Sequence, residues 1–275
     1  MPAAGSVYQH HAAAALSRPL SNLAGCTVFA ADIDQCVYDF NCRPLGYVDP
    51  SWLDERTRPV VARLGESGDA QAKALASSWL LRRFVLCADQ PTGPGFVGLQ
   101  HDAQDGAQQD ATRHFDFDFT EAAKRILLLD PPALNDVALL LGLSSLAHSL
   151  RKCVLRSQQL QLLDLLGEPL FVFFTEQVLA REPVARLVLD SQHRARLLAD
   201  DSLLHTSARF GATLLLLSCD APGSASHQRA RLKFTRAIGD VQRSRPLPEP
   251  RRDAVVEFSI DCVIRGRHPA WHWLF

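Results

Sequence analysis

A stripe of apolar residues near the middle of the chain constrains the fold more than any other feature of the sequence. The stripe consists of Leu139, Leu143, Leu146, Leu150 and Val154, at successive spacings of 4, 3, 4 and 4 residues. Side chains three and four positions apart lie on the same face of an α-helix. The pattern therefore predicts a long amphipathic helix whose leucine face packs into a hydrophobic core.

The residues around this stripe carry helix start and stop signals. Asp130-Pro131-Pro132 is typical of a helix start, because proline is tolerated in the first turn. Arg151 and Lys152 fall in the last turns, where cations complement the helix dipole. Comparable signals predict further helices at 157–166, from 168 onward, and at 183–199, 202–218 and 224–238.

Two helices are also expected nearer the N-terminus. Ser51 is placed to cap the first, with Asp54 in the capping-box position, and Gly65 is expected to end it. The second is expected to begin near Asp69. It carries into the core the apolar residues Leu75, Trp79, Leu80, Phe84 and Leu86.

The segments between the predicted helices divide the chain into three parts. Residues 1–25 are rich in alanine and are expected to form a flexible lead-in. A helical domain spans residues 26–245 and contains a loop insert at 90–114, which is rich in Gly, Gln, Asp and Pro. A proline-rich connector at 245–252 then introduces the segment 246–275, which is expected to pack on the same domain.

The predicted fold class is mainly α, an irregular helical bundle with a short extended segment near the N-terminus and a few short strands. The extended segment is expected within residues 27–50, where apolar and polar residues alternate. Residues 254–264 fit two structures: their apolar residues alternate as in a strand, whereas Val256, Ile260 and Val263 also fit one face of a helix.

Composition narrows the function classes. Hydrophobic residues make up 47% of the chain and charged residues 21%, as in a globular protein, and the net charge of −1 argues against nucleic-acid binding through charge alone. The leucine runs are too short to cross a bilayer, so we expect a cytoplasmic chain without membrane insertion. Seven cysteines without a CxxC pair predict buried free thiols.

Charge is unevenly distributed along the chain. Residues 1–140 carry 11 basic and 17 acidic side chains, whereas residues 221–275 carry 10 basic and 5 acidic ones. Such a distribution suits two differently charged partners, and it equally suits charge balance within one molecule.

One segment suggests an enzyme. Thr27–Asp34, an apolar stretch ending in two aspartates, looks like the first motif of haloacid-dehalogenase-like phosphatases. In that alternative Asp32 is the nucleophile, Asp34 the acid/base, and Mg²⁺ the required cation. The chain lacks a lysine followed at a suitable distance by an acidic pair, so the expected machinery is incomplete.

A second segment suggests metal ligands. The alternation in 114–119 places His114, Asp116 and Asp118 on one face of a strand. A half-buried edge strand, or a lead into a helix capped by Thr120, explains the same pattern. No other His or Cys has a matching spacing, so we expect no metal and no cofactor.

Two further segments carry a family resemblance. The first is Tyr38–Leu53, YDFNCRPLGYVDPSWL, called the signature segment below; the second is Leu141–Leu166. Together they resemble the SctK/YscK family of type III secretion sorting-platform proteins, with the basic stretch Arg229–Lys233 and the closing Trp271–Phe275 in the corresponding order.

The resemblance implies a non-catalytic, mainly helical protein at the cytoplasmic base of the secretion apparatus, peripheral to the inner membrane. Such proteins link the inner-membrane ring protein SctD to the pod protein SctQ, and through it to SctL and the ATPase SctN. Two patches are expected to bind the partners, the acidic N-terminal half and the basic tail. Candidate partner-binding residues are Arg43, Tyr47, Asp49, Trp52, Arg151 and Lys152. For Tyr47 and Trp52, packing against the first helix is the alternative.

Overall fold

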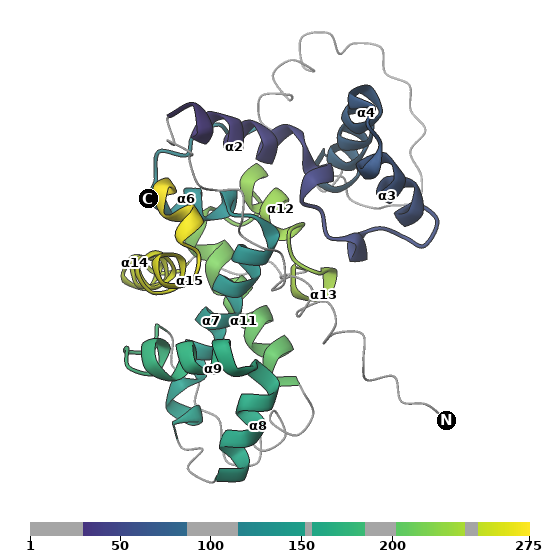
Figure 1. Cartoon of the computed structure of the whole chain (residues 1–275). Coiled ribbons are helices and arrows are strands. Elements are labelled where there is room, and N and C mark those ends of the chain that lie inside the picture. The colour runs from purple at the N-terminus through teal and green to yellow at the C-terminus, as the bar shows by residue number, and fades with distance from the viewer. Residues whose placement is uncertain (1–29, 87–114, 152–155, 185–201, 240–246) are drawn as a thin grey trace, which may run out of the picture.

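The computed structural model describes residues 30–86, 115–151, 156–184, 202–239 and 247–275 (Figure 1). Helices account for most of these residues and no strand occurs among them, which confirms the mainly α fold class. The α-helices are α2 (Ala30–Cys42), α3 (Arg58–Glu66), α4 (Ala70–Leu81), α6 (Ala122–Arg125), α7 (Pro131–Leu150), α8 (Arg156–Leu166), α9 (Glu168–Phe173), α11 (Ser202–Cys219), α12 (Ala225–Arg231), α13 (Arg236–Gly239), α14 (Glu249–Glu257) and α15 (Arg265–Arg267). Short 3₁₀ helices are η1 (Pro44–Gly46), η2 (Pro50–Trp52), η4 (Ile126–Leu128) and η7 (Pro269–Leu274), and π-helical turns are η3 (Arg82–Leu86), η5 (Phe174–Val178) and η6 (Phe258–Ile264).

The helices α7 and α11 form the centre of the molecule (Figure 1). As predicted, α7 starts behind Asp130, whose carboxylate accepts a hydrogen bond from the Ala133 amide at 2.9 Å. Its amphipathic character was predicted wrongly. Leu143, Leu146 and Leu150 are buried, but the other faces of α7 are buried as well, because α11, η5 and η6 surround it.

Two glycines allow the backbones of α7 and α11 to approach closely. A Cβ atom added to Gly142 would lie 1.9 Å from the Ser207 carbonyl oxygen, and one added to Gly211 would lie 1.7 Å from the Ala138 carbonyl oxygen. Both distances are far below van der Waals contact. The crossing therefore has no room for any larger side chain at either glycine.

Within the described part of the chain, α7 is the one helix long and apolar enough to cross a membrane by length and composition. Of its most apolar 18-residue window, 78% is buried inside the protein. This burial assigns the helix to the protein core, where an all-round hydrophobic helix is stable.

The N-terminal extended segment was predicted wrongly, because residues 30–42 form helix α2. Ile33, Val37 and Phe40 follow one another at helical spacings of 4 and 3 residues, and they face the main core. The alternation of apolar and polar residues in 27–50, from which the extended segment was predicted, is weaker than this helical spacing. Past α2, the signature segment continues through η1 and η2.

The next two helices differ from their predictions in instructive ways. The first helix begins at Arg58 rather than Ser51. The reason is that the Asp54 carboxylate accepts a hydrogen bond from the Thr57 amide at 2.8 Å, which stabilises a turn before the helix. The second, α4, begins behind Asp69 as predicted. Its residues Leu75 and Trp79 are 66% and 38% exposed, so their predicted place in the core was wrong.

The C-terminal helices pack on the same core cluster as α7 and α11. Helix α14 begins at Glu249 and continues into η6, so residues 254–264 are helical, and the strand alternative is excluded. The predicted connector 245–252 is helical from Glu249, because a proline at the first positions starts a helix.

Four other helix predictions have mixed outcomes. The helices predicted at 157–166, from 168 and at 202–218 are confirmed as α8, α9 and α11, and Gly167 between the first two has a φ of 72°. The helix predicted at 224–238 is two short ones, α12 and α13. Predictions on residues 1–25, 90–114, most of 183–199, Lys152 and Val154 lie outside the described residues.

Candidate interaction surfaces

Two aromatic residues fix the signature segment to the body of the protein. The Tyr47 hydroxyl donates to the Phe40 carbonyl at 2.7 Å, and the two rings stack at 5.8 Å. Trp52 is 6% exposed, and its indole Nε1 donates to the Phe234 carbonyl at 2.8 Å. Burial raises the pKa of Tyr47 far above its usual range. Of the two alternatives for Tyr47 and Trp52, the geometry favours packing.

A buried lysine links the signature segment to the turn η4. The Lys233 ammonium donates to the carbonyls of Leu127 and Leu129 at 2.7 and 2.6 Å. It also lies 4.9 Å from the ring centroid of Phe40 and 5.2 Å from that of Tyr47. Burial lowers the pKa of Lys233 to about 7, against the attraction of Asp130. One side chain thus holds three separate segments together.

A buried arginine lies on the same side of the signature segment. Arg229 is fully buried, its Nε donates to the Asn41 carbonyl at 3.2 Å, and its guanidinium lies 5.1 Å from the Phe115 ring centroid. Its Nη2 has no hydrogen-bond partner among the described residues, and burial lowers the pKa of the guanidinium. The basic stretch Arg229–Lys233 therefore contributes to the core at Arg229 and Lys233.

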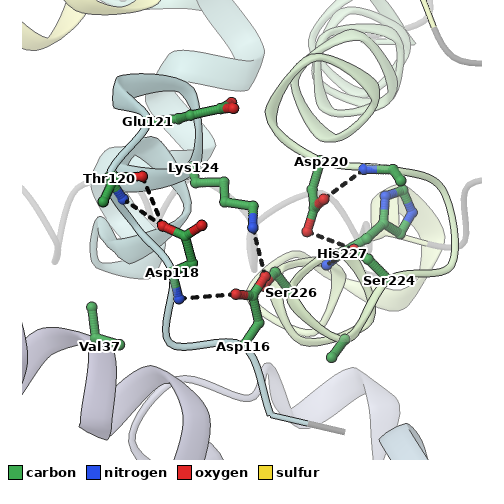
Figure 2. Close-up of polar contacts among 12 residues, drawn as sticks. Val37, Asp116, Asp118, Thr120, Glu121, Lys124, Asp220, Ser224, Ser226 and His227 are labelled. Carbon is green, nitrogen blue, oxygen red and sulfur yellow. Dashed lines mark hydrogen bonds and ion pairs between the residues drawn. The ribbon is translucent and has the colours of Figure 1, made fainter. Parts of the chain in front are cut away.

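Residues 115–120 do not form the predicted strand, and Figure 2 shows the cluster that they make instead. The Asp116 carboxylate accepts bonds from Lys124 Nζ and Ser226 Oγ, both at 2.8 Å. The Asn41 side chain donates a hydrogen bond to the Asp116 carbonyl at 2.6 Å and accepts one from the Asp116 backbone amide at 3.2 Å. Burial raises the pKa of Asp116, but the bonds from Lys124 and Ser226 outweigh it and lower that pKa.

The described residues contain no group of three His, Cys, Asp or Glu side chains that could hold a metal ion. Asp118 accepts hydrogen bonds from Thr120, at 2.7 Å from its hydroxyl and 3.2 Å from its amide, and so caps the following turn. The segment therefore leads into α6, but the N-cap of that helix is Glu121 and not the predicted Thr120. His114 lies outside the described residues.

Replacing Asp116 with asparagine is expected to lower the free energy of unfolding at pH 7 by about 1–2 kcal/mol, because a partly buried charge-assisted bond to Lys124 loses its charge. A carboxylate with a lowered folded pKa stabilises the protein above its unfolded pKa of about 3.9 and loses that contribution as the pH falls through the folded value. Urea unfolding should therefore show a constant loss from pH 7 to 5 that shrinks at more acidic pH. Asp118→Asn is the control, with a smaller change.

The premise of the phosphatase alternative was wrong. Asp32 and Asp34 lie in the first turns of helix α2, not at the end of a strand, and both are exposed. Residues two positions apart on a helix point in nearly opposite directions. The two carboxylates therefore do not converge on one point.

Helices α3 and α4 form an arm that stands off the body of the protein (Figure 1). None of the nine residues of α3, all of which the structure describes, is buried. Val60 is 54% exposed, and Leu75 and Trp79 on α4 are exposed as described above. Large apolar side chains gathered on one projecting element are typical of a protein-binding surface.

The charged candidate residues lie in three different settings. Arg43 is exposed and pairs with Asp39 at 2.9 Å. The Asp49 carboxylate accepts the Ser51 amide at 2.9 Å, which caps η2. Arg151, at the end of α7, donates to the carbonyls of Leu179 and Arg181. Arg43 and Asp49 therefore belong to the signature segment, whereas Arg151 holds a different part of the chain at the end of α7.

Two arginines of the basic tail form ion pairs with the first half of the chain. Arg252 contacts Glu121 at 2.6 Å, and Arg267 contacts Asp136 at 3.2 Å. These pairs join the C-terminal helices to the acidic first half of the chain. Charge balance within one molecule therefore accounts for part of the uneven distribution, while Arg236 and Arg251 remain exposed and Arg265 pairs with Asp261 on its own segment.

Comparisons with protein-family models, curated proteins and solved structures found no match for this chain. The resemblance to the SctK/YscK family rests on the two segments of the sequence described above. The structure shows where the first of these segments lies. The signature segment is anchored to the body of the protein and leads directly into the arm.

Proposed function

We propose that this protein is a non-catalytic cytoplasmic adaptor of the type III secretion sorting platform, at the cytoplasmic face of the inner membrane. In this proposal it links the inner-membrane ring protein SctD to the pod protein SctQ, and through SctQ to SctL and the ATPase SctN. An adaptor requires two separate binding surfaces on one rigid body.

The observation that carries the proposal is the exposed arm. Leu75 and Trp79 present apolar surface on α4, and this helix is attached to the body through the anchored signature segment. Exposed aromatic and leucine side chains supply the central contacts of protein interfaces. An arm of this kind suits the capture of a partner.

A second surface lies at the other end of the molecule. Helices α8 and α9 lie beyond the α7–α11 pair, away from the arm (Figure 1). On them Leu160 is 49% exposed and Val172 is 42% exposed. Two apolar surfaces at opposite ends fit a bridge between two partners.

Pull-down from cells that co-produce the SctQ-type and SctD-type proteins of the same genome tests the proposal. The wild-type chain is expected to retain both partners. Leu75→Ala with Trp79→Ala is expected to lose one of them, and the matched variant Leu160→Ala with Val172→Ala to lose the other. A wild-type chain that retains neither partner would contradict the proposal.

A further inference from the structure

An open groove separates the arm from the signature segment. Its cavity volume is about 580 Å³, a size typical of ligand-binding pockets. One wall is α4, and the opposite wall includes Tyr38, Leu45 and Phe115. Tyr38 is 47% exposed, so part of its side chain is open to an incoming partner.

The charges of this groove have one sign. Among the described residues that line it, the charged side chains are Arg43 and Lys73, and neither an aspartate nor a glutamate is present. Arg43 pairs with Asp39 and lies 5.2 Å from the Tyr38 ring centroid. The exposed Lys73 ammonium has no partner among the described residues. An occupant gains most if it brings a carboxylate to Lys73.

We propose that this groove binds an apolar, acidic peptide segment of one of the two platform partners, an assignment that rests on the adaptor function proposed above. A large apolar side chain of that segment lies in the groove between Tyr38 and Ala74. Flanking carboxylates pair with Lys73 and with the exposed edge of Arg43. Apolar anchors in a groove with charges at its rim are a common mode of peptide recognition.

Binding of the purified SctQ-type protein and of the SctD-type cytoplasmic domain, measured by calorimetry, tests the inference. Ala74→Phe fills the groove from an exposed position, and Lys73→Glu reverses the free charge. Each variant is expected to weaken one partner at least tenfold. The matched control is Arg209→Glu, which reverses an exposed charge on α11, outside the groove, the arm and helices α8 and α9, and is expected to leave both affinities unchanged.

The outcomes separate this inference from the proposed function. If both partners bind the wild type, Ala74→Phe and Lys73→Glu equally well, the groove assignment is wrong and the adaptor function stands. If neither partner binds the wild type, the adaptor function itself fails, and the assignment with it.

Two other occupants would also overturn the inference. Loss of unfolding stability in isolated Ala74→Phe that disappears when residues 90–112 are replaced by a Gly-Ser linker would identify the chain's own segment. A wild-type dimer in light scattering that Ala74→Phe converts to a monomer would identify a second copy.

Discussion

Gly142→Ala is expected to lower the free energy of unfolding by about 3 kcal/mol or more, the upper end of the range for an overpacked core. The added methyl group would lie 1.9 Å from the Ser207 carbonyl oxygen and 2.8 Å from the Ser207 Cα. These are backbone atoms of α11, so no side-chain rotation removes the clash, and the two central helices must separate. Thermal or urea unfolding of the purified variant measures the loss, expected as a drop of about 10 °C in the melting temperature.

Gly65→Ala is the matched control, because nothing lies within 4 Å of a Cβ atom added there. In α3 it is expected to leave stability unchanged or raise it by up to about 1 kcal/mol, since alanine favours helix. A Gly142→Ala protein that melts like the wild type would mean that α7 and α11 do not cross at this glycine.

Lys233→Met is expected to change how stability depends on pH. The folded pKa of Lys233 is about 7, because burial lowers it, whereas an unfolded lysine has a pKa of about 10.4. Between these values the unfolded chain binds a proton that the folded protein lacks. Wild-type stability should therefore rise by about 1.4 kcal/mol per pH unit relative to the methionine variant.

Urea unfolding of both proteins at pH 7.5, 8.5 and 9.5 measures this difference. Burial raises the folded pKa values of Tyr47 and Cys219, so these side chains begin to lose protons in this range only when unfolded. Both proteins contain them, so their contributions cancel in the comparison. Below about pH 7 the lysine is protonated in both states, and the difference should become constant. A difference that stays constant up to pH 9.5 would show that the ammonium keeps its proton in the folded protein.

The sequence predicts the position of the central helix well, but not its surroundings. Asp130 and the prolines after it mark the start of α7 correctly. Ser144 and Ser145 lie outside the leucine stripe, yet both are buried, and both hydroxyls donate to the Leu141 carbonyl, at 2.8 and 3.0 Å. Serine side chains can be buried when their hydroxyls donate hydrogen bonds to the backbone of their own helix. A polar residue in the sequence therefore does not always mark a solvent-exposed face of a helix.

The anchoring of the signature segment is harder to predict. Lys233 and Arg229 read as parts of a basic surface because their acceptors are backbone carbonyls, which have no sequence signal. The carbonyls that accept from Lys233 are 106 and 104 residues away in the chain. The helical spacing of Ile33, Val37 and Phe40 was the signal that could have identified α2.

The bridging of two partners by opposite ends of this protein is tested most directly by size-exclusion chromatography with light scattering. The purified chain is mixed with the SctQ-type protein and the SctD-type cytoplasmic domain, separately and together. We expect one species that contains all three proteins, with neither partner displacing the other. Two partners that exclude each other, or a chain that elutes alone, would contradict it.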